Sequence, residues 1–262
     1  MHALRVLRAF LSIGVLNIVQ YRSDFAIAVV NVLVSLATQV LGLSVIFTNT
    51  TDLRGWTADD LLVLIGVHFL ISGLVGLVIR PSMEALMEGI RLGTFDFLLT
   101  KPADAQLLAS VQRIAPQAAT DLLVGVGVVA YGISRTGLTL GPVPVLLFVV
   151  TLVAGFATVY GFLLLLSTMA FWFVKLDNIL VIFQALFGNA GRWPVTIFPG
   201  WLRPVLTFVV PIAFAVTVPA QALTGQLSGL TALLSVGVAA LFLVGSRVFW
   251  LVALRHYTGA SA

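Results

Sequence analysis

Side chains that could carry out chemistry are few in this sequence, and they are far apart. There is no cysteine, so thiolate metal sites, cysteine nucleophiles and disulfide bonds are excluded. The histidines are His2 and His256, near the two ends, and His68 between them, a distribution that predicts no metal site. No serine is paired with a candidate base. We therefore expect no catalytic site, and we do not expect the chain itself to be an enzyme.

Charged side chains gather instead in one stretch, residues 80–113, which holds both glutamates of the protein. Within it, four apolar residues recur at the i, i+3, i+4, i+7 spacing of one helix face. They are Met83, Leu86, Met87 and Ile90. The charged residues of the opposite face are Glu84, Glu88 and Arg91. With Pro81 in the first turn and Gly93 as a stop, this pattern predicts a short amphipathic helix over residues 82–92.

The composition around this stretch is that of an integral membrane protein. The 262 residues are 60% hydrophobic and 9% charged, against roughly 25% charged residues in soluble domains, and the mean hydropathy is +1.12. We expect an all-α fold in a single transmembrane domain, residues 1–262. The net charge of +4 does not indicate nucleic-acid binding, because the basic residues are dispersed between apolar runs and form no patch.

The apolar runs predict six transmembrane helices, since about 20 apolar residues cross a bilayer. They cover approximately residues 25–47, 61–79, 116–133, 143–174, 178–187 and 228–252. Residues 1–24 predict an amphipathic helix at the cytoplasmic interface, with an uncleaved secretory signal as the alternative. With the N-terminus inside, ten basic residues are cytoplasmic and four external, so both termini are expected in the cytoplasm.

Residues 193–225 contain too many prolines for one lipid-exposed helix. The prolines are Pro194, Pro199, Pro204, Pro211 and Pro219. We expect short broken helices that enter the membrane from outside and return. A complete crossing here would instead give seven spans and an external C-terminus.

Several polar residues within or next to the spans have two interpretations each. His68 either contacts substrate or protons, or bonds to a neighbouring helix. Asn31 and Gln39, eight residues apart on one helix face, either line a pathway or hold helices together. Asp121 either pairs with Arg113 or is solvated at the interface. Arg192 and Arg203, next to Trp193 and Trp201, either contact lipid phosphates or an anionic substrate, or anchor the interface.

The amphipathic helix over 82–92 has three possible uses. It can lie on the lipid surface, dock into a soluble partner, or remain a solvated loop helix without a partner.

Three segments of this chain occur in an informative order. They are IRLGTFDFLLTKP at 90–102, RWPVTIFPGWLRPVLTFVVPIAFAVTVPAQALTG at 192–225, and LRHYTGAS at 254–261. Together they resemble the membrane subunits of ATP-binding-cassette (ABC) exporters of the type-2 (ABC-2) permease class. In that class the second segment is an extracellular re-entrant region, which places Pro199, Gly200, Trp201 and Arg203 within it.

The resemblance implies a permease of the bacterial plasma membrane that exports a substrate. It pairs with a second permease subunit, the same or a homologous chain, and with two copies of a cytoplasmic ABC ATPase. Residues 80–113 would be the coupling segment, with the apolar stripe in a groove of the ATPase and the charges fixing its orientation. The chain has no GxxxxGK[ST] loop, so ATP and Mg would be held by the partner ATPase, and this chain would bind no cofactor. The alternatives are a secondary transporter or channel that does not use ATP, and a membrane-embedded enzyme such as a lipid hydrolase.

Overall fold

A computed structural model describes residues 22–138, 141–173 and 178–257, which are helical apart from their connections and one isolated bridge between Leu53 and Trp56. The longer elements are α2 (Arg22–Phe47), α3 (Ala58–Leu74), α4 (Arg80–Arg91), α7 (Ala119–Thr136), α8 (Pro142–Thr168), α9 (Ile179–Ala190) and α12 (Gly229–His256). The short α-helices are α5 (Asp96–Leu99), α6 (Ala105–Ser110), α10 (Leu202–Pro204) and α11 (Val218–Leu223). The π-helical turns are η1 (Val75–Ile79), η5 (Val205–Val209) and η6 (Ala213–Thr217), and the 3-10 turns are η2 (Pro116–Ala118), η3 (Met169–Phe171) and η4 (Val195–Ile197). The predicted interface helix at 1–24 lies outside the described residues, except for its last three, which begin α2.

Five of these helices are long and apolar enough to cross a membrane, as predicted for an all-α membrane protein. They cover Asp24–Phe47, Ala58–Arg91, Pro116–Thr136, Pro142–Phe171 and Gly229–His256. The span expected from residue 178 is only the 12-residue α9, about 18 Å long and too short to cross a core of about 30 Å alone. The chain turns after α9 at Gly191, and Pro194 follows. The later segments Leu202–Val209 and Ala213–Leu223 form a sixth apolar unit, bent by 75° at the break that contains Pro211.

The second span and the predicted amphipathic helix are one continuous helix, Ala58–Arg91, instead of two elements. It begins with a capping box in which Thr57 accepts from the Asp60 amide and Asp60 accepts from the Thr57 amide. The π-turn η1 ends one residue before Arg80 and Pro81 begin α4, and Pro81 has no amide hydrogen to donate to the preceding turn. The Leu77 carbonyl, which would accept from residue 81 in a regular α-helix, accepts from the Ala115 amide at 2.9 Å instead. Pro81 therefore leaves the helix intact and provides an attachment point for the segment that leads into α7.

Helices α3 and α7 pack with their backbones in contact, and glycines seven residues apart make this possible. The glycines are Gly66 and Gly73 on α3 and Gly125 and Gly132 on α7. A Cβ atom on Gly66 would lie 2.6 Å from the Val129 amide nitrogen, and one on Gly125 would lie 2.7 Å from the Leu70 amide nitrogen. Small residues replace the hydrophobic driving force that lipid does not supply, because they allow close van der Waals contact between helices.

Helix α8 packs against α12, α11 and η6 on the other side of the bundle. Gly155 and Gly161 again permit close approach, since a Cβ on either would lie 2.7 Å from the carbonyl oxygen of Phe214 or Phe242, respectively. Residues 212–220 are all buried, so the bent segment forms part of the core. Its buried position explains how a proline-rich stretch is tolerated in the membrane.

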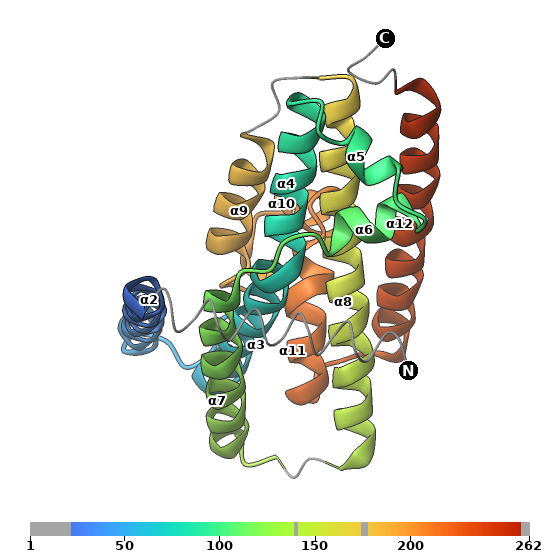
Figure 1. The fold of residues 1–262 in the computed structure, drawn as a ribbon. Helices are drawn as coiled ribbons and strands as arrows, with labels where there is room; N and C mark the ends of the chain where they lie inside the picture. The colour runs from blue at the N-terminus through green and yellow to red at the C-terminus, as the bar shows by residue number, and fades with distance from the viewer. Residues whose placement is uncertain (1–21, 139–140, 174–177, 258–262) are drawn as a thin grey trace.

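The helix ends and their connections lie at two opposite ends of the bundle (Figure 1). The ends of α4 and α12, the start of α9, and α5 lie at one end, and the end of α7, the start of α8 and the α11–α12 turn lie at the other. Helix α2 is seen nearly along its own axis, whereas α3, α7, α8 and α12 run along the bundle. Most apolar side chains of α2 are exposed, so this helix lies at the surface of the molecule and contributes little to its core.

Candidate coupling segment and membrane cavity

The apolar stripe predicted to dock into an ATPase faces the interior of this chain. Met83, Leu86 and Met87 are 0%, 1% and 5% exposed, and Ile90 is half-buried. Helix α4 contacts α8, α6 and η3. Because α4 continues α3 without a break, its apolar face remains directed at the bundle. The expectation that this stripe enters a groove on a partner is therefore corrected for Met83, Leu86 and Met87, which are part of the core, whereas Ile90 packs against the core and is only partly buried.

Two charged residues predicted to orient the partner make ion pairs within the chain. Arg80 Nε lies 2.8 Å from Glu84 Oε1, and Arg113 Nη2 lies 3.1 Å from Glu88 Oε2. Arg91 is exposed at the end of α4. The connector between α4 and α7, residues 92–118, is held to α4 near its end by the ion pair of Arg113 with Glu88. This pair also shows that Arg113 does not pair with Asp121, as one interpretation of the sequence had it.

Three exposed apolar side chains at this end of the bundle directly follow α4 in the chain. Phe97 is 73% exposed, Leu92 61% and Leu99 41%, and all three lie within the IRLGTFDFLLTKP segment. Lys101 is exposed beside them. Sequence periodicity missed these residues because the turn Gly93–Thr94 interrupts the helix between Leu92 and Phe97. The signal that does find them is an aromatic residue placed among charged residues in a polar connector.

Hydrogen bonds and aromatic contacts fasten this connector to the spans. Ser82 Oγ donates to the Arg113 carbonyl at 2.9 Å and accepts from the Arg113 amide at 3.2 Å. Arg247, on α12, donates to both carboxylate oxygens of Asp104, at 3.1 and 2.7 Å. Asp104 also caps α6 by accepting from the Leu107 amide. The hydrogen bonds from Arg247 lower the pKa of Asp104 below its usual range.

An aromatic cluster completes the attachment. The Phe95 ring meets Phe171, Trp250 and Tyr257 edge to face, with ring centroids 5.3, 5.9 and 5.5 Å away. Burial, together with a hydrogen bond to Asp96, raises the pKa of Tyr257 to about 12. The connector therefore contacts α4, η3 and α12 directly, so that displacement at Phe97 would be passed to three parts of the bundle.

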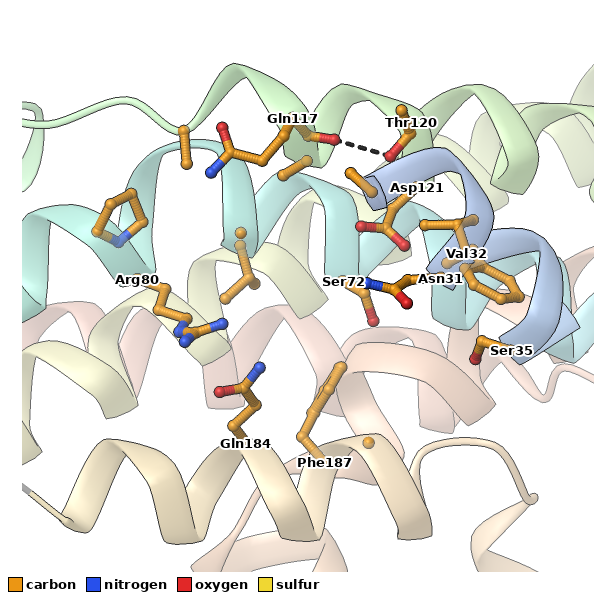
Figure 2. A pocket seen from close by; sticks show the side chains of 18 of the residues that line it. Asn31, Val32, Ser35, Ser72, Arg80, Gln117, Thr120, Asp121, Gln184 and Phe187 are labelled. Atoms are coloured by element: carbon orange, nitrogen blue, oxygen red, sulfur yellow. Dashed lines mark hydrogen bonds between the residues drawn. The ribbon is translucent and has the colours of Figure 1, made fainter. Parts of the chain in front are cut away.

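A cavity of about 590 Å³ lies between α2, the α3–α4 helix, α7 and α9 (Figure 2). Two of the three predicted pathway residues, Asn31 and His68, line it. The third, Gln39, lines a smaller cavity of about 170 Å³ that shares Arg192 with the first. Gln39 donates to Ser35 in its own helix, and its side chain forms no hydrogen bond to another helix within the described part of the chain. Its place next to a cavity favours the pathway interpretation over that of interhelical attachment.

His68 is the most deeply placed ionisable residue of the larger cavity. It is 5% exposed, and its ring stacks on Phe187 with centroids 5.4 Å apart. Its Nδ1 atom has no hydrogen-bond partner among the described residues. A Cβ atom on Gly191 would lie 2.9 Å from this nitrogen, so Nδ1 faces the backbone immediately before Arg192. This nitrogen therefore does not support the interpretation in which His68 bonds to a neighbouring helix.

The proline-rich segment is held together by Arg203. Its Nε donates to the Phe198 carbonyl at 3.0 Å and its Nη2 to the Thr196 carbonyl at 2.6 Å. Arg54, in the α2–α3 loop, reaches the same Thr196 oxygen at 3.4 Å. Pro199 and Gly200 are exposed, and Trp201 is 72% exposed, as suits an interfacial tryptophan. These bonds engage Arg203 within its own segment, which favours anchoring over the contact with lipid phosphate or substrate.

The model of the family described as ABC-2 family transporter protein matches this chain over residues 33–261. Comparisons with curated proteins and with solved structures gave no significant match. The matched range covers most of the chain, and it includes residues 80–113, the bent helix pair and most of the residues that line the larger cavity. The arrangement of apolar helices described above is that of a multi-pass membrane permease. The chain therefore belongs to the ABC-2 family of transporter proteins.

Proposed function

We propose that this chain is the permease subunit of an ATP-driven exporter in the bacterial plasma membrane, with both termini in the cytoplasm. The observation that carries the proposal is the family match across residues 33–261. The complex would contain two copies of a cytoplasmic ABC ATPase and a second permease, the same or a homologous chain. ATP and Mg would be bound by the ATPase, since this sequence has no GxxxxGK[ST] loop.

We place the ATPase contact on the segment after α4, with Phe97 at its centre and Leu92 and Leu99 beside it. Their exposure supports this choice, as does the position of α5 at the end of the bundle where α4 and α12 also end (Figure 1). A large aromatic side chain that enters a pocket is the usual centre of a protein interface. The bonds of the connector to α4 and α12 would transmit closure of the ATPase dimer to the spans, and so shift them between two packings.

The first test is to purify the tagged chain from its native membrane in mild detergent and weigh the intact complex by mass spectrometry. We expect two ATPase copies and two permease-sized chains, whose masses distinguish a homodimer from a heterodimer. Recovery of the permease alone, under conditions that preserve a control ABC transporter, would favour a secondary transporter or channel.

The second test addresses the position of the contact. Phe97→Asp should reduce recovery of the ATPase at least about tenfold, because removal of an interface anchor costs roughly 2 kcal/mol or more. The matched control is Leu138→Asp, an exposed apolar residue that follows α7 at the opposite end of the bundle. Equal recovery with Phe97→Asp and Leu138→Asp would show that the contact lies elsewhere.

A further inference from the structure

Two charges of opposite sign line the larger cavity without being neutralised. Asp121, on α7, and Arg192, just after α9, both border it, and neither has a hydrogen-bond or ion-pair partner among the described residues. The other charged residues of its lining, Arg80 and Glu84, pair with each other at 2.8 Å. The cavity thus offers one free carboxylate and one free guanidinium group.

Unpaired charges within membrane spans are costly, and they are characteristic of ligand pathways. The position of Asp121 in the first turn of α7 explains part of its stability, because the helix dipole favours an acid there. It does not explain Arg192, whose Nε atom is buried without a partner, or the orphaned Nδ1 of the adjacent His68. A ligand that carries both charges would satisfy all three groups.

The rest of the lining fits an amphipathic molecule. Figure 2 shows Asn31 and Ser72 directed into the part of the cavity that Asp121 faces, where they could accept further hydrogen bonds from a cationic group. Phe187 from α9 and Phe69 from α3 supply apolar wall. The volume of about 590 Å³ lies within the range of small-molecule sites, roughly 300–1,000 Å³.

We propose that this cavity binds the zwitterionic headgroup of an amphipathic molecule, with its ammonium group at Asp121 and its phosphate or carboxylate group at Arg192 and His68. The assignment rests on the proposed function only in treating the ligand as the transported molecule. The ligand is either a lipid of the surrounding bilayer or a separate amphipathic cargo, and the two share this chemistry.

The proposal is tested by equilibrium binding to the purified full-length chain in nanodiscs of phosphatidylglycerol. Three fluorescent probes with the same acyl chain are compared. These are a lysophosphatidylethanolamine, which is zwitterionic, its N-acetylated form, which is anionic, and the corresponding alkylamine, which is cationic. We expect the zwitterion to bind at least about tenfold more tightly than either singly charged probe, since hydrogen bonds to charged groups contribute about that factor. Equal affinities for the three probes overturn the proposal, and this result requires no variant to fold.

The variants identify which group meets which charge. Asp121→Asn should weaken the zwitterion about tenfold and leave the anionic probe unchanged, whereas Arg192→Gln should weaken the zwitterion and leave the cationic probe unchanged. The matched controls are Asp59→Asn and Arg135→Gln, which alter a pair 3.5 Å apart outside the cavity. Losses of the same size in the control variants would contradict the assignment.

Two further readouts separate the remaining questions. In nanodiscs of phosphatidylethanolamine, a loss of probe binding would identify a bilayer lipid as the occupant, and unchanged binding would identify a separate cargo. ATPase recovery with a chain that does not distinguish the probes would leave the permease assignment intact and remove the ligand class. Probe selectivity without any recovered ATPase would do the reverse.

Discussion

Replacement of Gly125 by alanine tests whether direct backbone contact holds α3 and α7 together. A Cβ at this position would lie 2.7 Å from the Leu70 amide nitrogen and 3.0 Å from the Gly66 carbonyl oxygen. Ordinary contact begins near 3.4 Å, so the two helix backbones would have to separate by about 0.7 Å. Backbone atoms cannot rotate away as side chains do. We therefore expect the free energy of unfolding to fall by about 1–3 kcal/mol, the usual cost of overpacking.

The same helix supplies a control for this substitution. Gly127 is exposed, and a Cβ added there would have nothing within 4 Å, so Gly127→Ala should gain up to about 1 kcal/mol from helix propensity. The two variants should differ by about 1–4 kcal/mol, or roughly 2–16 °C in Tm for a protein of this size. Tryptophan fluorescence during heating of the detergent-solubilised protein measures this difference. If Gly125→Ala melts at or above the wild-type temperature, the helices are not in backbone contact and the argument from glycine spacing is wrong.

Three other predictions follow from contacts near the cavity and the connector. Asp104→Asn keeps the cap of α6 but loses the ion pair with Arg247. Because the folded-state pKa of Asp104 is lowered, this pair stabilises the protein above about pH 4, and the stabilisation is lost as the pH falls below that value. The difference in Tm between wild type and variant, worth at most about 1 kcal/mol at pH 7, should therefore shrink toward zero in acid, and a constant difference would contradict this. Gly191→Ala should lower the Tm, because its Cβ would lie 2.5 Å from the Phe187 carbonyl oxygen and 2.9 Å from His68 Nδ1. Gly188→Ala, three residues earlier and with nothing within 4 Å, should not lower it, and equal melting of the two variants would disprove the predicted crowding. Ser82→Ala should lower the free energy of unfolding by about 1–3 kcal/mol, because it leaves the backbone groups of Arg113 unpaired. Amide hydrogen exchange should rise at residues 111–115, and Ser134→Ala, at an exposed position, serves as the control. Unchanged exchange would show that Ser82 does not hold the connector.

Local chemistry was predictable where one short stretch determines it. The capping box at Thr57 and Asp60, the cap at Asp104, and the break in the proline-rich segment all depend on neighbours in sequence, and the structure has all three. Residues 178–187 were predicted to be a transmembrane span, but α9 in this region is too short to cross the membrane alone, because hydropathy reports that a segment is apolar and not how far the helix continues. The seven-residue spacing of the glycines in α3 and α7 was present in the sequence, but which helix these glycines contact depends on how the helices pack.

The partner of a helix face was not predictable from periodicity. The stripe at Met83, Leu86 and Met87 indicates that one face is apolar, and a core, a lipid surface and a docking groove all require the same pattern. Only the continuity of α4 with α3 decides between them. The pairing of Arg113 with Glu88, which leaves Asp121 free in the cavity, likewise depends on long-range geometry.

The π-turn η1 explains how one helix serves two neighbours. An inserted residue advances the helical phase by about 100°, so the face that packs best before the turn is not the face that packs best after it. Before η1 the helix presents glycines to α7, and after η1 it presents methionine and leucine side chains toward α8. The helix thereby changes the direction of its packing face and remains continuous. A displacement of the connector would consequently reach both α7 and α8, because the continuous helix Ala58–Arg91 contacts both.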